Sequence, residues 1–242
     1  MIELKDSNVK YSFIISYRDR EEHLSKLLPR LNEIMGGESY EIIVAEQDNS
    51  EKFQKNSLYN IAAQQSKGEL LIFHDVDYYP TDDVTYDTNE STPLYPVRKV
   101  IFLNSEDEHR PHNDIPKGYN KFKDDVGDHS GGVFVISKSL FYKTKGLNPY
   151  YKGWGKEDDD TRDRLRLLGY EWERNVQGTF YGLYHEDSKP EDTDQDFINN
   201  HILLSNLKNT LHLGYKNVSA DIEEFDAEGV RWIKIKNFKY DS

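Results

Sequence analysis

The 242-residue chain has no cysteine, so it can form neither a disulfide nor a thiolate metal site. No apolar run approaches the length of a membrane span, and the first residues, Met1 to Asp6, lack the apolar stretch of a signal peptide. Basic residues are outnumbered, and the formal net charge of -13 argues against nucleic acid or an anionic membrane as a partner. These absences predict a soluble protein, most simply a cytoplasmic one.

The composition is nevertheless that of a folded globular protein. Hydrophobic residues make up 36% of the sequence, with 17 Tyr, 11 Phe and 3 Trp, which argues against disorder despite the many charges. No internal repeat or low-complexity linker divides the chain. We therefore expect a single domain covering residues 1–242.

Strand and helix patterns alternate in the first third of the chain. Short apolar runs rich in β-branched residues predict strands at residues 11–16, 40–45 and 70–73. Apolar residues at helical spacing predict one helix in each interval between them. This order predicts an α/β fold with a mostly parallel central sheet flanked by helices, in the manner of a Rossmann-like nucleotide-binding half.

The rest of the chain is less regular. Strands are expected at 97–103, 131–137, 179–184 and 230–238. Helices are expected at 159–168 and 198–213, and a short helix after the strand at 131–137 has Ser137 as its predicted N-cap.

Charged side chains follow two of the predicted strands. Arg18 and Arg20 come after the first strand, whereas Asp75 and Asp77 follow the third. Ligands bind at the carboxyl ends of strands in such sheets, so we expect all four at the binding edge. An Asp-x-Asp pair suits Mg²⁺ or Mn²⁺ bridging a diphosphate, although such pairs also occur in solvated turns. His185 could complete a metal site beside them, since imidazole suits Mn²⁺ better than Mg²⁺.

The most informative stretch places an aromatic residue between two glycines and then four consecutive acids: Gly153-Trp154-Gly155-Lys156-Glu157-Asp158-Asp159-Asp160. Acids at the start of a helix are favoured by its dipole and could simply cap it. That explanation does not account for the Trp. A flat ring beside carboxylates is what a sugar site needs, because the ring takes the apolar face of the sugar and the acids accept hydroxyl protons.

Together these segments resemble the β-1,4-galactosyltransferase family of inverting GT-A glycosyltransferases. Order and spacing agree from about residue 11 to the C-terminal strands, and residues 153–160 are the most specific segment. The supporting pieces are Tyr17–Leu24, Phe73–Asp77, Gly131–Val133 with Ser137-Lys138, and His185. The resemblance implies a GT-A fold with a nucleotide-binding half at about 9–80 and an acceptor-binding, catalytic half at about 130–242.

The resemblance also implies roles for individual residues. The expected contacts of the UDP-sugar donor are Ser16, Tyr17, Arg18, Asp19, Arg20, Phe53, Lys55, Asp75, Val76, Asp77 and Trp154. Asp77 and His185 would hold Mn²⁺ (or Mg²⁺), and Asp158 would be the catalytic base. The expected sugar-binding residues are His129, Gly132, Trp154, Lys156, Glu157, Asp158 and Asp159. The polar loop after His185 would be a lid.

Three departures from the family's pattern modify these expectations. Gly182 stands where animal members have a Met metal ligand, which would leave the metal one protein ligand short. His129 stands where the family has a Tyr that discriminates between galactose and N-acetylgalactosamine, so either sugar could be the donor sugar of this chain. The cysteines, membrane anchor and stem of the family's Golgi-resident members are missing, which predicts a cytoplasmic enzyme of bacterial or viral origin.

We therefore expect a metal-dependent inverting transferase that moves galactose or N-acetylgalactosamine from a UDP-sugar to a saccharide hydroxyl. One alternative is transfer of another UDP-sugar, since chondroitin-type polymerases share a similar Trp-Gly-Gly-Glu-Asp signature. The other is a catalytically inactive sugar- or nucleotide-binding module. The presence of Asp158 beside Asp77 and His185 argues against the inactive module, because binding alone needs no base.

Overall fold

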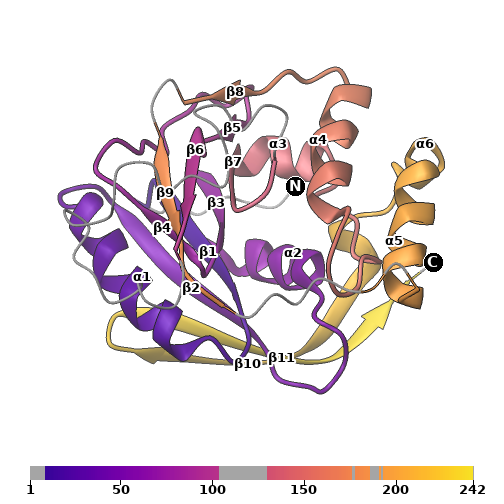
Figure 1. The fold of residues 1–242 in the computed structure, drawn as a ribbon, viewed down its shortest axis with the longest axis horizontal. Coiled ribbons are helices and arrows are strands. Elements are labelled where there is room, and N and C mark those ends of the chain that lie inside the picture. The colour runs from indigo at the N-terminus through magenta and orange to yellow at the C-terminus, as the bar shows by residue number, and fades with distance from the viewer. Residues whose placement is uncertain (1–8, 104–129, 176–177, 186–190, 192, 242) are drawn as a thin grey trace.

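The computed structural model describes residues 9–103, 130–175, 178–185, 191 and 193–241 (Figure 1). Its strands are β1 (Tyr11–Tyr17), β2 (Tyr40–Gln47), β3 (Leu70–Asp75), β4 (Tyr78–Pro80), β5 (Leu94–Tyr95), β6 (Lys99–Phe102), β7 (Val133–Ser137), β8 (Glu173–Arg174), β9 (Thr179–Gly182), β10 (Val218–Ala227) and β11 (Val230–Tyr240). Its helices are α1 (Glu21–Ile34), α2 (Lys55–Gln65), α3 (Lys138–Lys143), α4 (Glu157–Leu167), α5 (Gln195–Ser205) and α6 (Leu207–Thr210), with a 3-10 turn η2 (Tyr215–Asn217).

An eight-stranded sheet in the order β10-β11-β2-β1-β3-β7-β5-β8 forms the centre of the described chain. β1 lies between β2 and β3 and is parallel to both, and β11 is parallel to β2. At one side of the sheet β10 pairs antiparallel with β11, and at the other side β7 pairs antiparallel with both β3 and β5. A smaller sheet has the order β4-β9-β6. The predicted α/β fold with a central sheet flanked by helices is confirmed.

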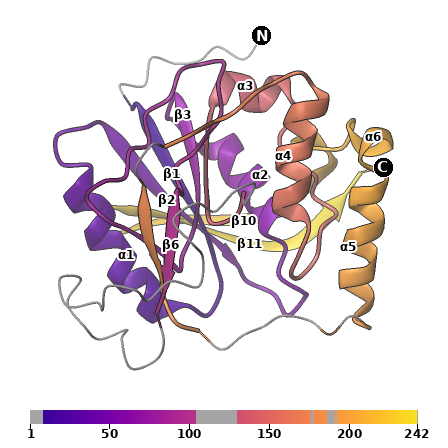
Figure 2. The same cartoon turned by 45° about the horizontal axis from the view of Figure 1, so that its top comes forward.

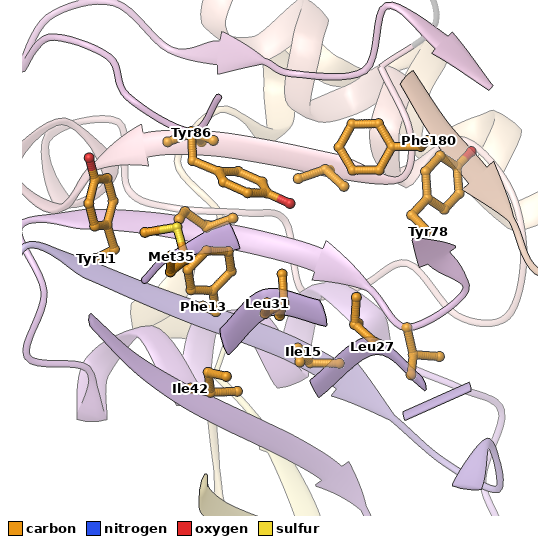
Figure 3. Packing of buried hydrophobic residues seen from close by; sticks show 14 of the residues in the cluster. Tyr11, Phe13, Ile15, Leu27, Leu31, Met35, Ile42, Tyr78, Tyr86 and Phe180 are labelled. Atoms are coloured by element: carbon orange, nitrogen blue, oxygen red, sulfur yellow. The ribbon is translucent and has the colours of Figure 1, made fainter. Parts of the chain in front are cut away.

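The centre of the sheet is buried on both faces, and all seven residues of β1 are buried. Phe13 and Ile15 pack with Leu27 of α1 on one face (Figure 3), whereas Ile14 packs with Leu58 of α2 on the other. All five side chains are fully buried, and each contributes about 1.5–3 kcal/mol by burial. Figure 2 shows α1 on the opposite side of the sheet from α2, α4 and α5.

The strand order β2-β1-β3 creates a topological switch point. The connection through α1 leads from β1 to β2, which lies on one side of β1. The connection through α2 then leads from β2 back past β1 to β3, which lies on the other side. Ser16 of β1 lies in register with Asp75 of β3, so the two strands end together. Doubly wound sheets bind ligands in the crevice outside such strand ends. Residues 17–20 and 75–77 border this crevice.

Several element predictions differ from the structure. α4 begins at Glu157 rather than at residue 159, because Lys156 takes a left-handed conformation with φ of 75° and ends the preceding loop. The helix expected at 198–213 is divided at Asn206 into α5 and α6. β4, β5, β8 and β10 were not predicted; β10 is exposed along most of its length and lacks an apolar run. The N-cap role of Ser137 is confirmed, since its Oγ accepts from the Leu140 N–H at 3.2 Å.

Candidate active site

One ammonium group contacts three carboxylates, one from β3 and two from α4. The Nζ atom of Lys55, at the start of α2, lies 2.9 Å from Asp158 Oδ1, 3.0 Å from Glu157 Oε1 and 3.6 Å from Asp75 Oδ2. We call these four residues the carboxylate cluster. The end of β3 supplies Asp75, and the first turn of α4 supplies the other two acids. The resemblance placed Lys55 among the contacts of the UDP-sugar donor, but in the structure its ammonium is engaged by the three acids.

The surroundings of Asp158 in the carboxylate cluster bring its pKa close to neutral pH. Burial raises the pKa of Asp158 to about 7; Lys55 opposes this rise, and the charges of Glu157 and Asp75 add to it. Burial likewise raises the pKa of Asp75, against the effect of Lys55. The Asp158 side chain keeps 37% of its surface exposed, so a ligand can reach it. A general base is most effective with a pKa near the working pH, and Asp158 meets that condition.

Tyr59 is a residue of this site that the sequence reasoning missed. Its hydroxyl donates to Asp75 Oδ1 at 2.9 Å and accepts from Ser16 Oγ at 3.3 Å. Tyr59 follows Lys55 by one helical turn, so both side chains lie on the same face of α2, towards β3. That spacing was the available signal, because any side chain one turn after Lys55 faces the same strand end.

Asp77 and His185, predicted to act together, lie side by side. Asp77 Oδ2 is 3.1 Å from His185 Nε2, with the two side chains 21% and 28% exposed. Antiparallel pairing of β4 with β9 brings them together, since Tyr78 lies opposite Gly182. Burial alone would raise the pKa of Asp77, but the hydrogen bond and charge of His185 lower it. The ring of His23 lies edge-on to His185 at 6.3 Å.

This pair fits a divalent cation only in part. A carboxylate oxygen and an imidazole nitrogen suit Mn²⁺. A third protein ligand at Gly182 has no room, because a Cβ atom there would lie 2.5 Å from the Phe102 ring. Among the described residues, no three His, Cys, Asp or Glu side chains gather closely enough to hold a metal ion. A cation bound by Asp77 and His185 would need further oxygen ligands from a diphosphate or water.

The Trp154 ring is displayed at the surface of a glycine-flanked loop. Trp154 is 48% exposed and stacks on Phe197 of α5, with ring centroids 5.9 Å apart. Gly153 and Gly155 have φ values of 66° and 104°, which favour glycine. The N–H of Gly153 donates to the carbonyl of Phe53 at 2.7 Å, so the loop lies against the segment that precedes α2.

The predicted donor contacts at the end of β1 are only partly accessible. Arg18 donates to the Glu51 carbonyl at 2.6 Å, and its guanidinium lies 5.3 Å from the Phe53 ring. Asp19 is exposed with φ of 52°, and Arg20 is the N-cap residue of α1. These side chains border the crevice, as expected.

Three other predicted donor contacts have buried side chains. Ser16 is 4% exposed and bonds to Tyr59. Tyr17 packs edge-on against Trp232 at 5.6 Å, and Val76 belongs to the core on the α1 side. Only the backbone of these residues could meet a nucleotide without rearrangement.

The four acids at the start of α4 have different partners. Asp159 pairs with Lys156 and Arg162, each at 3.1 Å, near the exposed surface. Asp160 is fully buried and bonds to Arg164 Nε and to the Tyr151 hydroxyl, both at 3.1 Å. Asp160 therefore stabilises the fold, whereas Glu157 and Asp158 belong to the carboxylate cluster. Lys156, Glu157 and Asp159 all lie at the same helix start as Asp158.

Gly132, just before β7, contacts the strand end that carries Asp75 of the carboxylate cluster. Its carbonyl accepts from the Asp75 N–H at 2.8 Å, and a Cβ atom in its place would lie 2.1 Å from the Tyr78 ring. Ser130 Oγ donates to the carbonyl of Asp158 at 3.1 Å. His129, the residue expected to select the sugar, lies outside the described residues, and so does most of the predicted lid, at residues 186–190 and 192.

Comparison with known structures defines the class. The chain is similar to the catalytic domain of Drosophila β1,4-galactosyltransferase 7 in complex with xylobiose, with a TM-score of 0.69 and 22% identity over 97% of this chain and 95% of that one. Its fold is that of the GT-A glycosyltransferases.

Family models and relatives define the family. A model described as the N-terminal region of glycosyl transferase group 7 matches residues 5–89, and one described as the N-terminal domain of galactosyltransferase matches residues 114–186. Human β-1,4-galactosyltransferase 4 is 27% identical over 195 residues, which are 77% of this chain and 52% of the relative. A β-1,4-N-acetylglucosaminyl-transferase of Lymnaea stagnalis is 32% identical over 164 residues, or 64% of this chain and 30% of the relative. The chain belongs to the β-1,4-galactosyltransferase-like family.

The relatives also correct one expectation. The predicted cytoplasmic location of a bacterial or viral enzyme is wrong, because the matched galactosyltransferases are animal members of a family whose Golgi-resident enzymes carry an anchor and stem. This chain spans about half the length of the curated relatives it matches, and the point at which the sequence begins therefore indicates no compartment. Within the described residues, no helix is long and apolar enough to cross a bilayer.

Proposed function

We propose that this chain transfers galactose, or N-acetylgalactosamine, from a UDP-sugar to a hydroxyl of a saccharide acceptor, with inversion at the anomeric carbon. The observation that carries the proposal is the position of Asp158. Burial raises its pKa to about 7, its side chain is partly exposed, and one of the two other acids of its cluster, Asp75, ends the strand at the crevice. Residues at about 9–80 would then hold the nucleotide, and those at about 130–242 the acceptor.

Asp158 would act as the general base. Its carboxylate takes the proton of the acceptor hydroxyl while that oxygen forms a bond to the anomeric carbon. The bond from this carbon to the diphosphate oxygen breaks on the opposite face, and its electron pair leaves with UDP. The proton ends on Asp158 and the new glycosidic bond has the inverted configuration. Lys55 keeps the three neighbouring acids from repelling one another and holds Asp158 in place.

The donor would lie along the ends of β1 and β3. Arg18 has a fork of donors suited to a phosphate, and the Phe53 ring beside it has a flat face suited to a base. Asp77 and His185 would hold the Mn²⁺ ion. When bound, such an ion neutralises the charge that builds on the departing diphosphate. A similar Drosophila structure was solved with manganese, UDP-Gal and xylobiose, which supports this donor and cation.

The acceptor would lie on the other side of the carboxylate cluster. The exposed ring of Trp154 has an apolar face for a sugar ring, and the first turn of α4 adds hydrogen-bonding groups from Lys156, Glu157 and Asp159. The xylobiose in the Drosophila structures supports a saccharide as the acceptor.

A donor screen tests the proposed function. UDP release should be measured with UDP-galactose, UDP-N-acetylgalactosamine, UDP-glucose and UDP-N-acetylglucosamine, with and without Mn²⁺ and a panel of β-linked saccharides. We expect acceptor-dependent UDP release with one or both galacto-configured donors. Binding of UDP without turnover of any donor would contradict the proposal and favour an inactive binding module, and turnover confined to the gluco-configured donors would favour the alternative transferase.

A further inference from the structure

Asn200 is a buried polar side chain that bonds to the backbone of the Trp154 loop. It is 1% exposed, and it is the buried residue of α5. Its Nδ2 donates to the carbonyls of Lys152 at 2.9 Å and Trp154 at 3.5 Å, and its Oδ1 accepts from the Lys152 N–H at 3.3 Å. One amide thus satisfies backbone groups on both sides of Gly153.

The same face of α5 also supports the Trp154 ring. Phe197, nearly one turn before Asn200, stacks against the ring. A Cβ atom at Gly155 would lie 3.0 Å from the Phe197 ring, so the loop backbone comes close to this side chain as well. Glycine neighbours leave the Trp154 backbone many alternative conformations. The location of the Trp154 backbone therefore depends on the few hydrogen bonds that hold the loop, and Asn200 makes the hydrogen bonds from α5 described above.

α5 is itself attached to the donor side of the crevice. Asp194, its N-cap, accepts from the N–H groups of Asp196 at 2.9 Å and Phe197 at 3.2 Å. The other carboxylate oxygen of Asp194 is 3.1 Å from Lys52 Nζ. Lys52 precedes Phe53, whose carbonyl accepts from the Gly153 N–H. The donor-side segment, the start of α5 and the Trp154 loop are thus joined in a closed ring of contacts.

We propose that Asn200 is a positioning residue that fixes the Trp154 ring where an acceptor sugar stacks on it. The proposal rests on the proposed function for its effect on acceptor binding. Asn200 itself is too deeply buried to meet a substrate. Its effect should appear in the acceptor KM and in the exposure of the ring.

Asn200→Ala is the variant that tests this role. The matched control is Asn199→Ala, since Asn199 is its exposed neighbour on α5 and, within the described structure, the Asn199 side chain accepts from the Gln195 side chain rather than contacting the Trp154 loop. Ring exposure is measured by acrylamide quenching of Trp154 fluorescence, taken as the difference between each protein and its Trp154→Phe counterpart. This readout needs no substrate. Steady-state kinetics with a saturating donor then gives the acceptor KM and kcat separately.

We expect Asn200→Ala to raise the acceptor KM by at least about tenfold and to lower kcat less, because lost buried hydrogen bonds displace the loop without touching the base. Quenching of Trp154 should increase, and Asn199→Ala should match the unmodified protein. Unchanged quenching and unchanged acceptor KM in a folded Asn200→Ala variant would overturn the proposal.

A second variant covers the case in which Asn200→Ala does not fold. Asn200→Asp keeps the size and the acceptor for the Lys152 N–H but places a carboxylate against two carbonyl oxygens, so quenching should again increase. Equal quenching in Asn200→Asp and the unmodified protein would refute the positioning role. If no donor is turned over, the proposed function fails, but the quenching measurement still decides whether Asn200 fixes the ring.

Discussion

Lys55 and Asp158 form an ion pair of 2.9 Å although 103 positions separate them in the chain. The pair joins the start of α2, on the proposed donor side of the sheet, to the start of α4, which carries the acids that follow Trp154 in the chain. It also places a fixed cation against the proposed base. The proton affinity of Asp158 is then set by opposing effects, because burial and two neighbouring acids raise its pKa and Lys55 lowers it.

Replacing the base should abolish transfer without removing donor binding. Asp158→Asn keeps the shape of the side chain but cannot accept a proton, so we expect kcat to fall by at least about 10²-fold. UDP-sugar affinity, measured by calorimetry, should survive. Asp163→Asn, on the same helix and outside the cluster, is the control. Near-normal turnover in Asp158→Asn would show that another group takes the proton.

The activity should depend on pH through the same carboxyl. Asp158 must be ionised to act, so kcat/KM should rise with pH and level off above about 7.

The stability of the fold should depend on pH in the opposite direction. The folded protein binds the proton of Asp158 more tightly than the unfolded chain does. The stabilisation that this protonation gives the fold is therefore fully present below the ordinary pKa range of Asp, and it is lost as pH rises through about 7.

Thermal unfolding checks the sign of this linkage. Asp158→Asn should raise Tm relative to the unmodified protein at pH 8, and the difference should shrink at pH 5. A larger gain at pH 5 than at pH 8 would mean that Asp158 is not the group with the raised pKa.

Removing the cation of the cluster should make the base harder to ionise. Lys55→Gln leaves three acids without a counterion, so the rise of kcat/KM should move to higher pH and activity at pH 7 should fall roughly tenfold. Lys55→Arg keeps the charge and should retain the original pH profile. Lys208→Gln, which replaces an exposed lysine on α6, controls for loss of charge elsewhere. An unshifted profile in Lys55→Gln would separate Lys55 from the base.

The sequence predicted the parts of the site that follow from strand order. Asp75, Asp77 and Arg18 lie at strand ends because the alternating apolar patterns define a parallel sheet, and sheet geometry then fixes the binding edge. The pairing of Asp77 with His185 could be expected from the resemblance but not from spacing. It depends on β4, a strand of three residues that has no distinctive pattern.

The contacts that cross the molecule could not be predicted. Nothing in the chain marks Lys55 as the partner of Asp158, because each helix is placed by its packing against other elements, α2 against strands such as β1 and β2 and α4 against α5 and α6. Asp160 illustrates the converse. It has the same sequence environment as Asp158, but the helical rotation between them points it into the core, where Arg164 bonds to it. Burial, not local sequence, decides which of the two acids is available for chemistry.

Binding of UDP should depend on the cation and on its two proposed protein ligands. Asp77→Ala should abolish the Mn²⁺-dependent part of UDP binding, and His185→Ala should weaken it, because a diphosphate without its cation meets uncompensated carboxylates. Calorimetric titration of UDP with and without Mn²⁺ measures the effect. His201→Ala, an exposed histidine on α5, is the control for His185→Ala. Equal affinities for UDP with and without Mn²⁺ in the unmodified protein would exclude this metal site.

Donor choice should depend on His129. The resemblance assigns this position to the C2 substituent of the donor sugar, and a Tyr there crowds the acetamido group of N-acetylgalactosamine. His is smaller and lacks the phenol, so the pocket should accept both sugars. Ser130, the next residue, donates from its Oγ to the backbone carbonyl of Asp158.

A competition experiment measures the preference directly. With both donors in one reaction, we expect UDP-N-acetylgalactosamine and UDP-galactose to be used at comparable rates by the unmodified enzyme. His129→Tyr should shift the preference towards galactose by about 10- to 200-fold, the range of a single pocket contact worth about 1–3 kcal/mol. His129→Phe separates the size of the ring from its hydroxyl. A strong galactose preference that His129→Tyr leaves unchanged would show that another position selects the sugar.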